Sequence, residues 1–206
     1  MRLITALVVT LSFLISCKQQ SLESIPTFTE KGTVNVVVEI PNGTNKKLQY
    51  DKLEKSFRIE EINGKKRSID FLSYPGNYGF IPGTKMKKEF GGDGDAFDAL
   101  ILCESLPTST VMEVIPLGII QLDDNGEIDY KLVGIPADRN YQTIKARTLS
   151  DLQFDYPAIP NILDLWFTNY KGFGKTKVSG WIDEVQAVEE IKKWQTKSAL
   201  SNQPKN

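Results

Sequence analysis

The stretch from Met112 to Ile135, MEVIPLGIIQLDDNGEIDYKLVGI, decides the fold. Its first part, Met112–Leu122, is a long apolar run that contains several β-branched residues. The polar segment Asp124-Asn125-Gly126-Glu127 then turns the chain, because Asn-Gly is a strong signal for a tight hairpin turn. Tyr130–Ile135 returns as a second apolar run. The stretch therefore predicts a long β-hairpin.

Other short segments extend the β pattern outward from this hairpin. Asn35–Ile40 is rich in β-branched residues and predicts a strand. Ser56–Ile62 and Arg67–Leu72 flank Asn63-Gly64, which predicts a second hairpin. Val178–Ile182 predicts a last short strand. Many short strands of this kind suggest a closed or partly closed β-barrel.

Two helices are expected late in the chain. Pro160 suits the first turn of one helix. Apolar residues near helical spacing follow Pro160, and the helix is expected to end at Gly172. The second helix is expected from about Asp183, with Ala187 and Ile191 on one face. The predicted fold class is α+β, mainly β: a small closed or partly closed β-barrel flanked by two helices.

Length and composition fit one ordinary globular domain. The chain has 206 residues, 40% of them hydrophobic and 25% charged. Its formal net charge of -1 gives no general reason to expect nucleic acid as a partner. Positive residues must therefore be judged by where they cluster.

The first residues have the pattern of a secretory signal peptide. A short positive start precedes an apolar run, Leu3–Ile15, that is too short to span a bilayer comfortably. The run ends in Leu14-Ile15-Ser16-Cys17, which resembles a bacterial lipobox and predicts lipidation of Cys17; an uncleaved anchor is the alternative. This pattern assigns residues 1–16 to a signal peptide, 17–32 to a tether, 33–197 to the folded domain and 198–206 to a polar tail. It also predicts a lipid-anchored, extracytoplasmic location in the bacterial cell envelope.

The strongest chemical signal is Asp93-Gly94-Asp95-Ala96-Phe97-Asp98, whose three carboxylates would repel one another unless a positive charge lay among them. Because the chain has no histidine, the ligand set would be oxygen only, which favours a hard cation: Mg²⁺ first, then Mn²⁺ or Ca²⁺. An isolated Asp-Gly-Asp is more often a surface turn. A calcium loop of the EF-hand type fails here, because Phe97 and Asp98 stand where a ligand and a glycine are required.

Further charged and aromatic residues could complete a site. Asp129 and Lys131 lie two residues apart on a predicted strand, so their side chains leave by the same face, although a plain surface ion pair would look the same. Asp124 precedes the hairpin turn, and Tyr170-Lys171 ends a predicted helix. Carboxylates that hold divalent ions beside cations that hold anionic oxygens suit phosphoryl transfer.

These motifs together resemble those of the family I inorganic pyrophosphatases. The resemblance covers roughly residues 33–195, and its motifs occur in the family's order. They are Glu39-Ile40-Pro41, Tyr74-Pro75-Gly76-Asn77-Tyr78-Gly79-Phe80, Asp93-Gly94-Asp95-Ala96-Phe97-Asp98, Asp129-Tyr130-Lys131 and Tyr170-Lys171. The resemblance implies a barrel of the OB type and assigns residues 33–197 to a pyrophosphatase domain.

The resemblance also implies roles for single residues. Asp95 would take a proton from the attacking water, and Tyr78 would lie near that water. The implied metal ligands are Asp93, Asp98, Asp129, Asp124 and Glu39. The implied substrate-binding residues are Lys47, Arg67, Lys131, Tyr170, Lys171 and Tyr74.

Two positions depart from the family pattern. Gln49 stands where the family usually has a glutamate, so one outer metal contact would lack its charge. The position of the family's phosphate-binding arginine corresponds to Lys66 when residues are counted strictly. The adjacent Arg67 is preferred, because its planar guanidinium suits phosphate binding.

The implied activity is Mg²⁺-dependent hydrolysis of pyrophosphate to two phosphates by direct attack of a metal-bridged water, with several metal ions in each site. A catalytically impaired metal- or phosphate-binding envelope lipoprotein is the alternative. The resemblance implies pyrophosphate and further copies of the chain as partners, and the lipobox-like segment implies a membrane through the lipid anchor only. Nucleic acid is not expected, because the candidate groove is acidic.

Overall fold

The computed structural model describes residues 22–201. The expected signal peptide and the expected lipidation site, Cys17, lie outside this range. None of the helices within residues 22–201 combines the length and the apolar character needed to cross a bilayer.

The described chain alternates short strands with a few helices. The strands are β1 Val34–Ile40, β2 Leu48–Asp51, β3 Ser56–Ile59, β4 Glu61–Ile62, β5 Lys65–Lys66, β6 Asn77–Phe80, β7 Asp98–Ile101, β8 Val111–Asp124, β9 Glu127–Ile128, β10 Lys131–Pro136 and β11 Thr176–Asp183. The α-helices are α1 Leu149–Asp155, α2 Ala158–Asn169, α3 Glu184–Lys193 and α4 Lys197–Ser201. Short 3₁₀ turns are η1 Leu22–Ser24, η2 Lys88–Phe90 and η3 Arg139–Tyr141.

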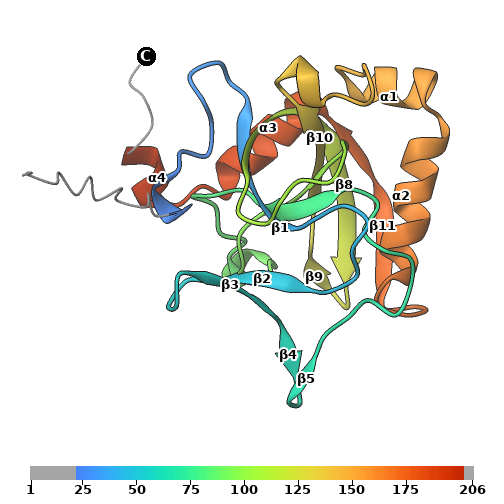
Figure 1. The fold of residues 1–206 in the computed structure, drawn as a ribbon. Coiled ribbons are helices and arrows are strands. Elements are labelled where there is room, and N and C mark those ends of the chain that lie inside the picture. Colours follow the sequence, from blue (N-terminus) through green and yellow to red (C-terminus); the bar gives the residue numbers. More distant parts are fainter. Residues whose placement is uncertain (1–21, 202–206) are drawn as a thin grey trace, which may run out of the picture.

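The main sheet closes on itself through its longest strand. Neighbouring strands follow the order β1-β6-β7-β10-β8, and β8 pairs again with β1, which completes a ring. The far half of β8 continues beyond the ring and pairs with β11. Figure 1 shows α1 and α2 together on one side of this barrel and the β4–β5 hairpin projecting from it. The predicted mainly β, partly closed barrel is therefore confirmed.

The central hairpin forms where the sequence places it. β8 pairs antiparallel with β10, and the chain turns at Asn125 and Gly126, both with positive φ (54° and 91°), as a hairpin turn of this type requires. Strands β1 and β11 also match their predicted segments.

The second predicted hairpin is smaller than expected. Asn63-Gly64 does turn the chain, but it joins only the short strands β4 and β5. Strand β3 pairs instead with β2, and residues 67–72 form no strand, so the expectation for Arg67–Leu72 was wrong. The turn signal fixes where the chain reverses, but the hairpin's length depends on how many flanking residues find a packing partner.

Two apolar cores lie on opposite faces of the sheet. Alternate residues of β7 divide between them: Ala99 and Ile101 pack with α3, whereas Leu100 packs with α1 and α2. Both faces of this strand are therefore buried, which explains its continuous apolar run. Gly79 on β6 lies so close to β1 that a Cβ atom would stand 1.9 Å from the Val37 carbonyl oxygen, so only glycine fits there.

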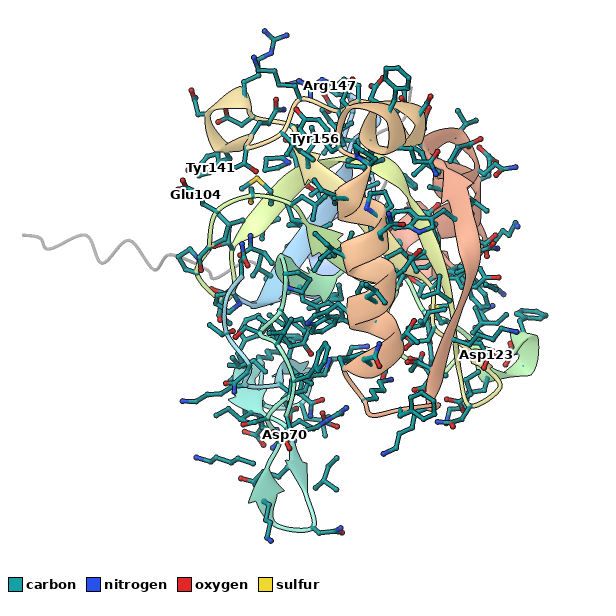
Figure 2. The ribbon with its side chains drawn as sticks, turned by 90° about the vertical axis from the view of Figure 1, so that its right-hand side faces the viewer. Asp70, Glu104, Asp123, Tyr141, Arg147 and Tyr156 are labelled. Atoms are coloured by element: carbon teal, nitrogen blue, oxygen red, sulfur yellow. The ribbon has the colours of Figure 1, made fainter. Side chains whose placement is uncertain are left out.

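Helices α1 and α3 begin at side chains that cap them. Asp183 accepts a hydrogen bond from the Gln186 N–H (2.8 Å) at the start of α3, as the sequence predicts. Helix α1 was not predicted, although Thr148 and Asp151 form a capping box at its start. In Figure 2, Arg147 and Tyr156 near α1 lie at the end of the molecule opposite Asp70 and Asp123.

Described segments that precede and follow residues 33–197 in the sequence also contribute to the packing. Within the segment expected as a tether, Thr27 is buried and its hydroxyl donates to the Pro82 carbonyl oxygen (2.9 Å). Beyond Lys197, α4 includes the buried Ala199. Both segments therefore pack on the domain that the sequence places between residues 33 and 197.

Candidate active site

One cavity, with a volume of about 230 Å³, collects the predicted site residues from distant parts of the chain. Every residue predicted for catalysis, metal binding or substrate binding within the described range lines it, except Tyr74. Tyr74 lies deeper, with its ring packed 5.2 Å from Tyr78 and 4.8 Å from Trp166 (centroid distances). The lining residues are Glu39, Lys47, Gln49, Tyr50, Lys52, Glu60, Arg67, Tyr78, Phe80, Asp93, Asp95, Ala96, Asp98, Asp124, Glu127, Asp129, Lys131, Tyr170 and Lys171.

The barrel explains why these residues meet. Strands β7 and β10 run parallel, with Asp98 paired directly to Lys131 at their first residues. Asp124 ends β8, and Asp129 follows β9, so the central hairpin delivers both carboxylates to the same end of the barrel. Tyr170 and Lys171 follow directly after α2. The site thus gathers strand ends and one helix end around a single opening.

Lys131 is the buried centre of the charge network. Its side chain is only 1% exposed, and its ammonium group donates to Asp98 Oδ2 (2.5 Å) and to Asp129 Oδ1. Burial lowers the pKa of Lys131, but the charges of Asp129 and Asp98 outweigh burial, so the net effect is a raised pKa. Asp129 lies between β9 and β10 and not on a strand, so the expectation of one shared strand was wrong, but Asp129 and Lys131 do form a buried ion pair.

A second lysine completes the network on the other side. The Lys171 ammonium group contacts Asp124 Oδ2 (2.5 Å) and lies 3.5 Å from Asp129 Oδ2. Burial raises the pKa of Asp129, but the charges of Lys131 and Lys171 outweigh it and lower that pKa overall. The Tyr78 hydroxyl donates to Asp98, and burial raises the pKa of Tyr78 well above its ordinary value.

Two other carboxyl groups are poised for a positive partner. Burial raises the pKa of Glu39 to about 7, although Lys47 and the Tyr50 N–H oppose the shift. Burial also raises the pKa of Asp93 to about 6, assisted by the negative charges of neighbouring aspartates. A cation bound beside either group would favour its charged form.

The carboxylates do not close around one point. Among residues 22–201, no set of three acidic or thiol side chains has the geometry of a finished metal site. Instead, the ammonium groups of Lys131 and Lys171 stand among the carboxylates. Carboxylates and ammonium groups are therefore interleaved in this cavity.

The site also contains residues that sequence reasoning missed. Glu60 accepts from Arg67 Nη1 (2.7 Å), and Glu127 stands across the hairpin turn from Asp124. The spacing of Asp124 and Glu127 around a strong turn could have indicated Glu127. Glu60 faces Arg67 across the Asn63-Gly64 turn in the same way, so that turn could have indicated Glu60. Of the two candidates for the phosphate-binding position, Arg67 lines the cavity, whereas Lys66 is exposed on β5.

The barrel has a cavity in which carboxylates and lysines are interleaved. These are the groups used by one class of enzymes, the phosphoryl-transfer enzymes that work with divalent cations. The model of the inorganic pyrophosphatase family matches residues 36–199. The inorganic pyrophosphatase of Neisseria meningitidis serogroup B is 33% identical over 171 residues, 81% of this chain and 89% of that relative. That of Sulfolobus acidocaldarius is 34% identical over 162 residues, 77% and 87% of the two chains. The chain belongs to the inorganic pyrophosphatase family.

Solved structures agree with this assignment. The crystal structure of an inorganic pyrophosphatase from Neisseria gonorrhoeae has a TM-score of 0.68 and 31% identity, covering 84% of this chain and 96% of that one. The one from Thermus thermophilus has a TM-score of 0.70 and 28% identity, covering 84% and 95%. The chain is accordingly an inorganic diphosphatase, a hydrolase.

The comparisons correct the expected location. The matched relatives above are named inorganic pyrophosphatases, with no lipid anchor or envelope location in those names. The family match begins at residue 36, beyond the segment that suggested an anchor. The expectation of a lipid-anchored protein of the bacterial envelope was therefore wrong. Assembly into a homo-oligomer stays a prediction.

Proposed function

We propose that the protein hydrolyses inorganic pyrophosphate to two phosphates, with Mg²⁺ held by the carboxylates of the cavity. The observation that carries this proposal is the single opening shared by Asp93, Asp95 and Asp98 with the cations Lys47, Arg67 and Lys171. A diphosphate bound with magnesium needs carboxylates that hold the metal and cationic side chains that hold the phosphate oxygens.

The residues present suit the metal. The donors are oxygen only, as magnesium prefers, and ammonium groups already contact Asp98, Asp129 and Asp124, so these carboxylates are stabilised by positive charge. The proposed ligands are Asp93, Asp98, Asp124 and Asp129, with Glu39 further out. When bound, magnesium would lower the pKa of water and neutralise charge on the diphosphate.

The chain's own side chains would supply the remaining steps. Asp95, exposed on the cavity wall, would accept the proton of the attacking water. Lys47, whose ammonium group lies 4.7 Å from the centre of the Tyr78 ring, would also bind the substrate. Arg67 and Lys171 would hold phosphate oxygens, and Tyr78 would fix Asp98 through its hydroxyl.

A phosphate-binding protein without turnover has less support. Its best argument is Gln49, which lines the cavity without the charge that the family usually has there. That change leaves every other proposed ligand in place, so it predicts altered metal affinity more readily than lost activity.

Metal dependence tests the proposed function. We expect purified protein to release phosphate from pyrophosphate with Mg²⁺, and release to stop when EDTA removes the metal and to return when Mg²⁺ is added back. Phosphate release would be followed in a colorimetric assay. Absence of release with Mg²⁺ or Mn²⁺, from protein shown to be folded by its circular dichroism spectrum, would refute the proposal.

A further inference from the structure

Glu60 joins two of the proposed substrate-binding cations through the backbone. The Glu60 N–H donates to the Lys47 carbonyl oxygen (2.8 Å), the Arg67 N–H donates to the Glu60 carbonyl oxygen (2.8 Å), and the Lys47 N–H donates to the Arg67 carbonyl oxygen (3.1 Å). These hydrogen bonds form a closed ring through the three residues. The ring fixes where the Lys47 and Arg67 side chains begin.

The Glu60 side chain adds a contact that the ring does not need. Its Oε2 accepts from Arg67 Nη1 (2.7 Å), and the two side chains are 23% and 26% exposed. Both residues line the catalytic cavity. A guanidinium has five N–H donors in a fixed fork, so a carboxylate on one side orients the remaining donors.

The same contact could merely stabilise the fold. Partly exposed ion pairs usually contribute little to stability, so a purely structural Glu60 would be almost dispensable. A carboxylate beside a phosphate-binding arginine also carries a cost, because it repels the substrate's negative charge. Its presence at the cavity is explained if it orients the guanidinium.

We propose that Glu60 is a positioning residue that holds Arg67 in the orientation that binds pyrophosphate. This inference rests on the proposed function. Glu60 would not touch the substrate; it would act through Arg67 Nη1 and leave the other guanidinium donors for phosphate oxygens.

The test compares kcat and KM for pyrophosphate at saturating Mg²⁺. Glu60→Ala removes the acceptor and should raise KM about tenfold, the effect expected from losing a charged hydrogen bond, with little change in kcat. Glu60→Gln keeps an acceptor oxygen and should restore KM to within about threefold of wild type. Glu61→Ala, at the neighbouring exposed glutamate on β4, is the matched control and should leave KM unchanged.

A double variant separates positioning from a general charge effect. In an Arg67→Gln background, Glu60→Ala should change KM no further, because the group that it orients is gone. Melting temperatures of all variants would show that the fold is intact.

Three results would overturn the inference: a lower KM in Glu60→Ala, equal KM values for Glu60→Ala and Glu61→Ala, or an undiminished effect in the Arg67→Gln background. Each would leave the proposed function standing, provided the wild-type protein hydrolyses pyrophosphate. An inactive wild-type protein would instead refute the proposed function, and the inference with it.

Discussion

Asp95→Asn is expected to lower kcat for pyrophosphate hydrolysis by about 10³-fold, because the amide cannot accept the proton of the attacking water. The substitution keeps size and shape, and the Asp95 side chain is exposed on the cavity wall, so no buried charge is lost. The affinity for Mg²⁺ should change little, since Asp93, Asp98 and Asp129 remain.

The backbone around Asp95 makes this variant a clean test. The Asp95 N–H donates to Asp93 Oδ1 (2.8 Å), and its carbonyl oxygen accepts from the Met86 N–H (2.7 Å). Neither bond uses the Asp95 carboxylate, so the loop should keep its shape in the variant. A loss of activity can then be assigned to the carboxylate itself.

Steady-state kinetics and the Mg²⁺ dependence of the melting temperature would be measured side by side. Asp70→Asn makes the same chemical change at an exposed aspartate outside the cavity lining and should be silent. Turnover in Asp95→Asn within a few-fold of wild type would remove Asp95 from the proposed role.

Lys131→Met is expected to reduce the free energy of unfolding by about 3 kcal/mol at pH 7 without metal, because it leaves Asp98 and Asp129 without their shared cation. Methionine has a similar length, which limits the packing defect. Binding of pyrophosphate should also weaken, as one positive group is lost from the cavity.

The stability loss should depend on pH in a definite direction. In the wild-type protein Asp129 has a lowered pKa, so its contribution is present above the unfolded-state pKa and is lost as pH falls through the folded-state pKa. In the Lys131→Met variant, Asp129 has lost the attraction of the Lys131 charge. The cost of burial then outweighs the attraction that remains and disfavours the charged form of Asp129. The difference in stability between the two proteins should therefore narrow as pH falls toward about 4.

Urea unfolding across that pH range would measure this difference. Lys192→Met is the matched control, since the Lys192 side chain is 52% exposed and its ammonium group pairs with Glu189 across one helical turn of α3. A Lys131→Met protein as stable as this control, with unchanged KM for pyrophosphate, would displace Lys131 from both roles.

Much of the fold could be predicted from strong local signals in the sequence. Asn125-Gly126 located the central hairpin, because few residues adopt positive φ at two successive positions. The same reasoning placed Asn63-Gly64 correctly but overextended its strands, since strand pairing is decided by partners far away in sequence. Strand β6 was not predicted, because Asn77 and Gly79 are poor strand formers in isolation.

The site could be predicted as a set of residues but not as an arrangement. The close spacing of Asp93, Asp95 and Asp98 identifies them as candidate site residues. The insertion of the Lys131 ammonium group between Asp98 and Asp129 depends on the parallel register of β7 and β10, which no local pattern shows. Glu60, by contrast, faces Arg67 across the β4–β5 hairpin, so the Asn63-Gly64 turn could have indicated this pair.

The most direct measurement is a crystal structure of the Asp95→Asn protein with Mg²⁺ and pyrophosphate. The account predicts metal density on Asp93, Asp98 and Asp129, and a diphosphate in contact with Lys47, Arg67 and Lys171. Metal and diphosphate bound outside this cavity, or a diphosphate that none of these cations reaches, would contradict it.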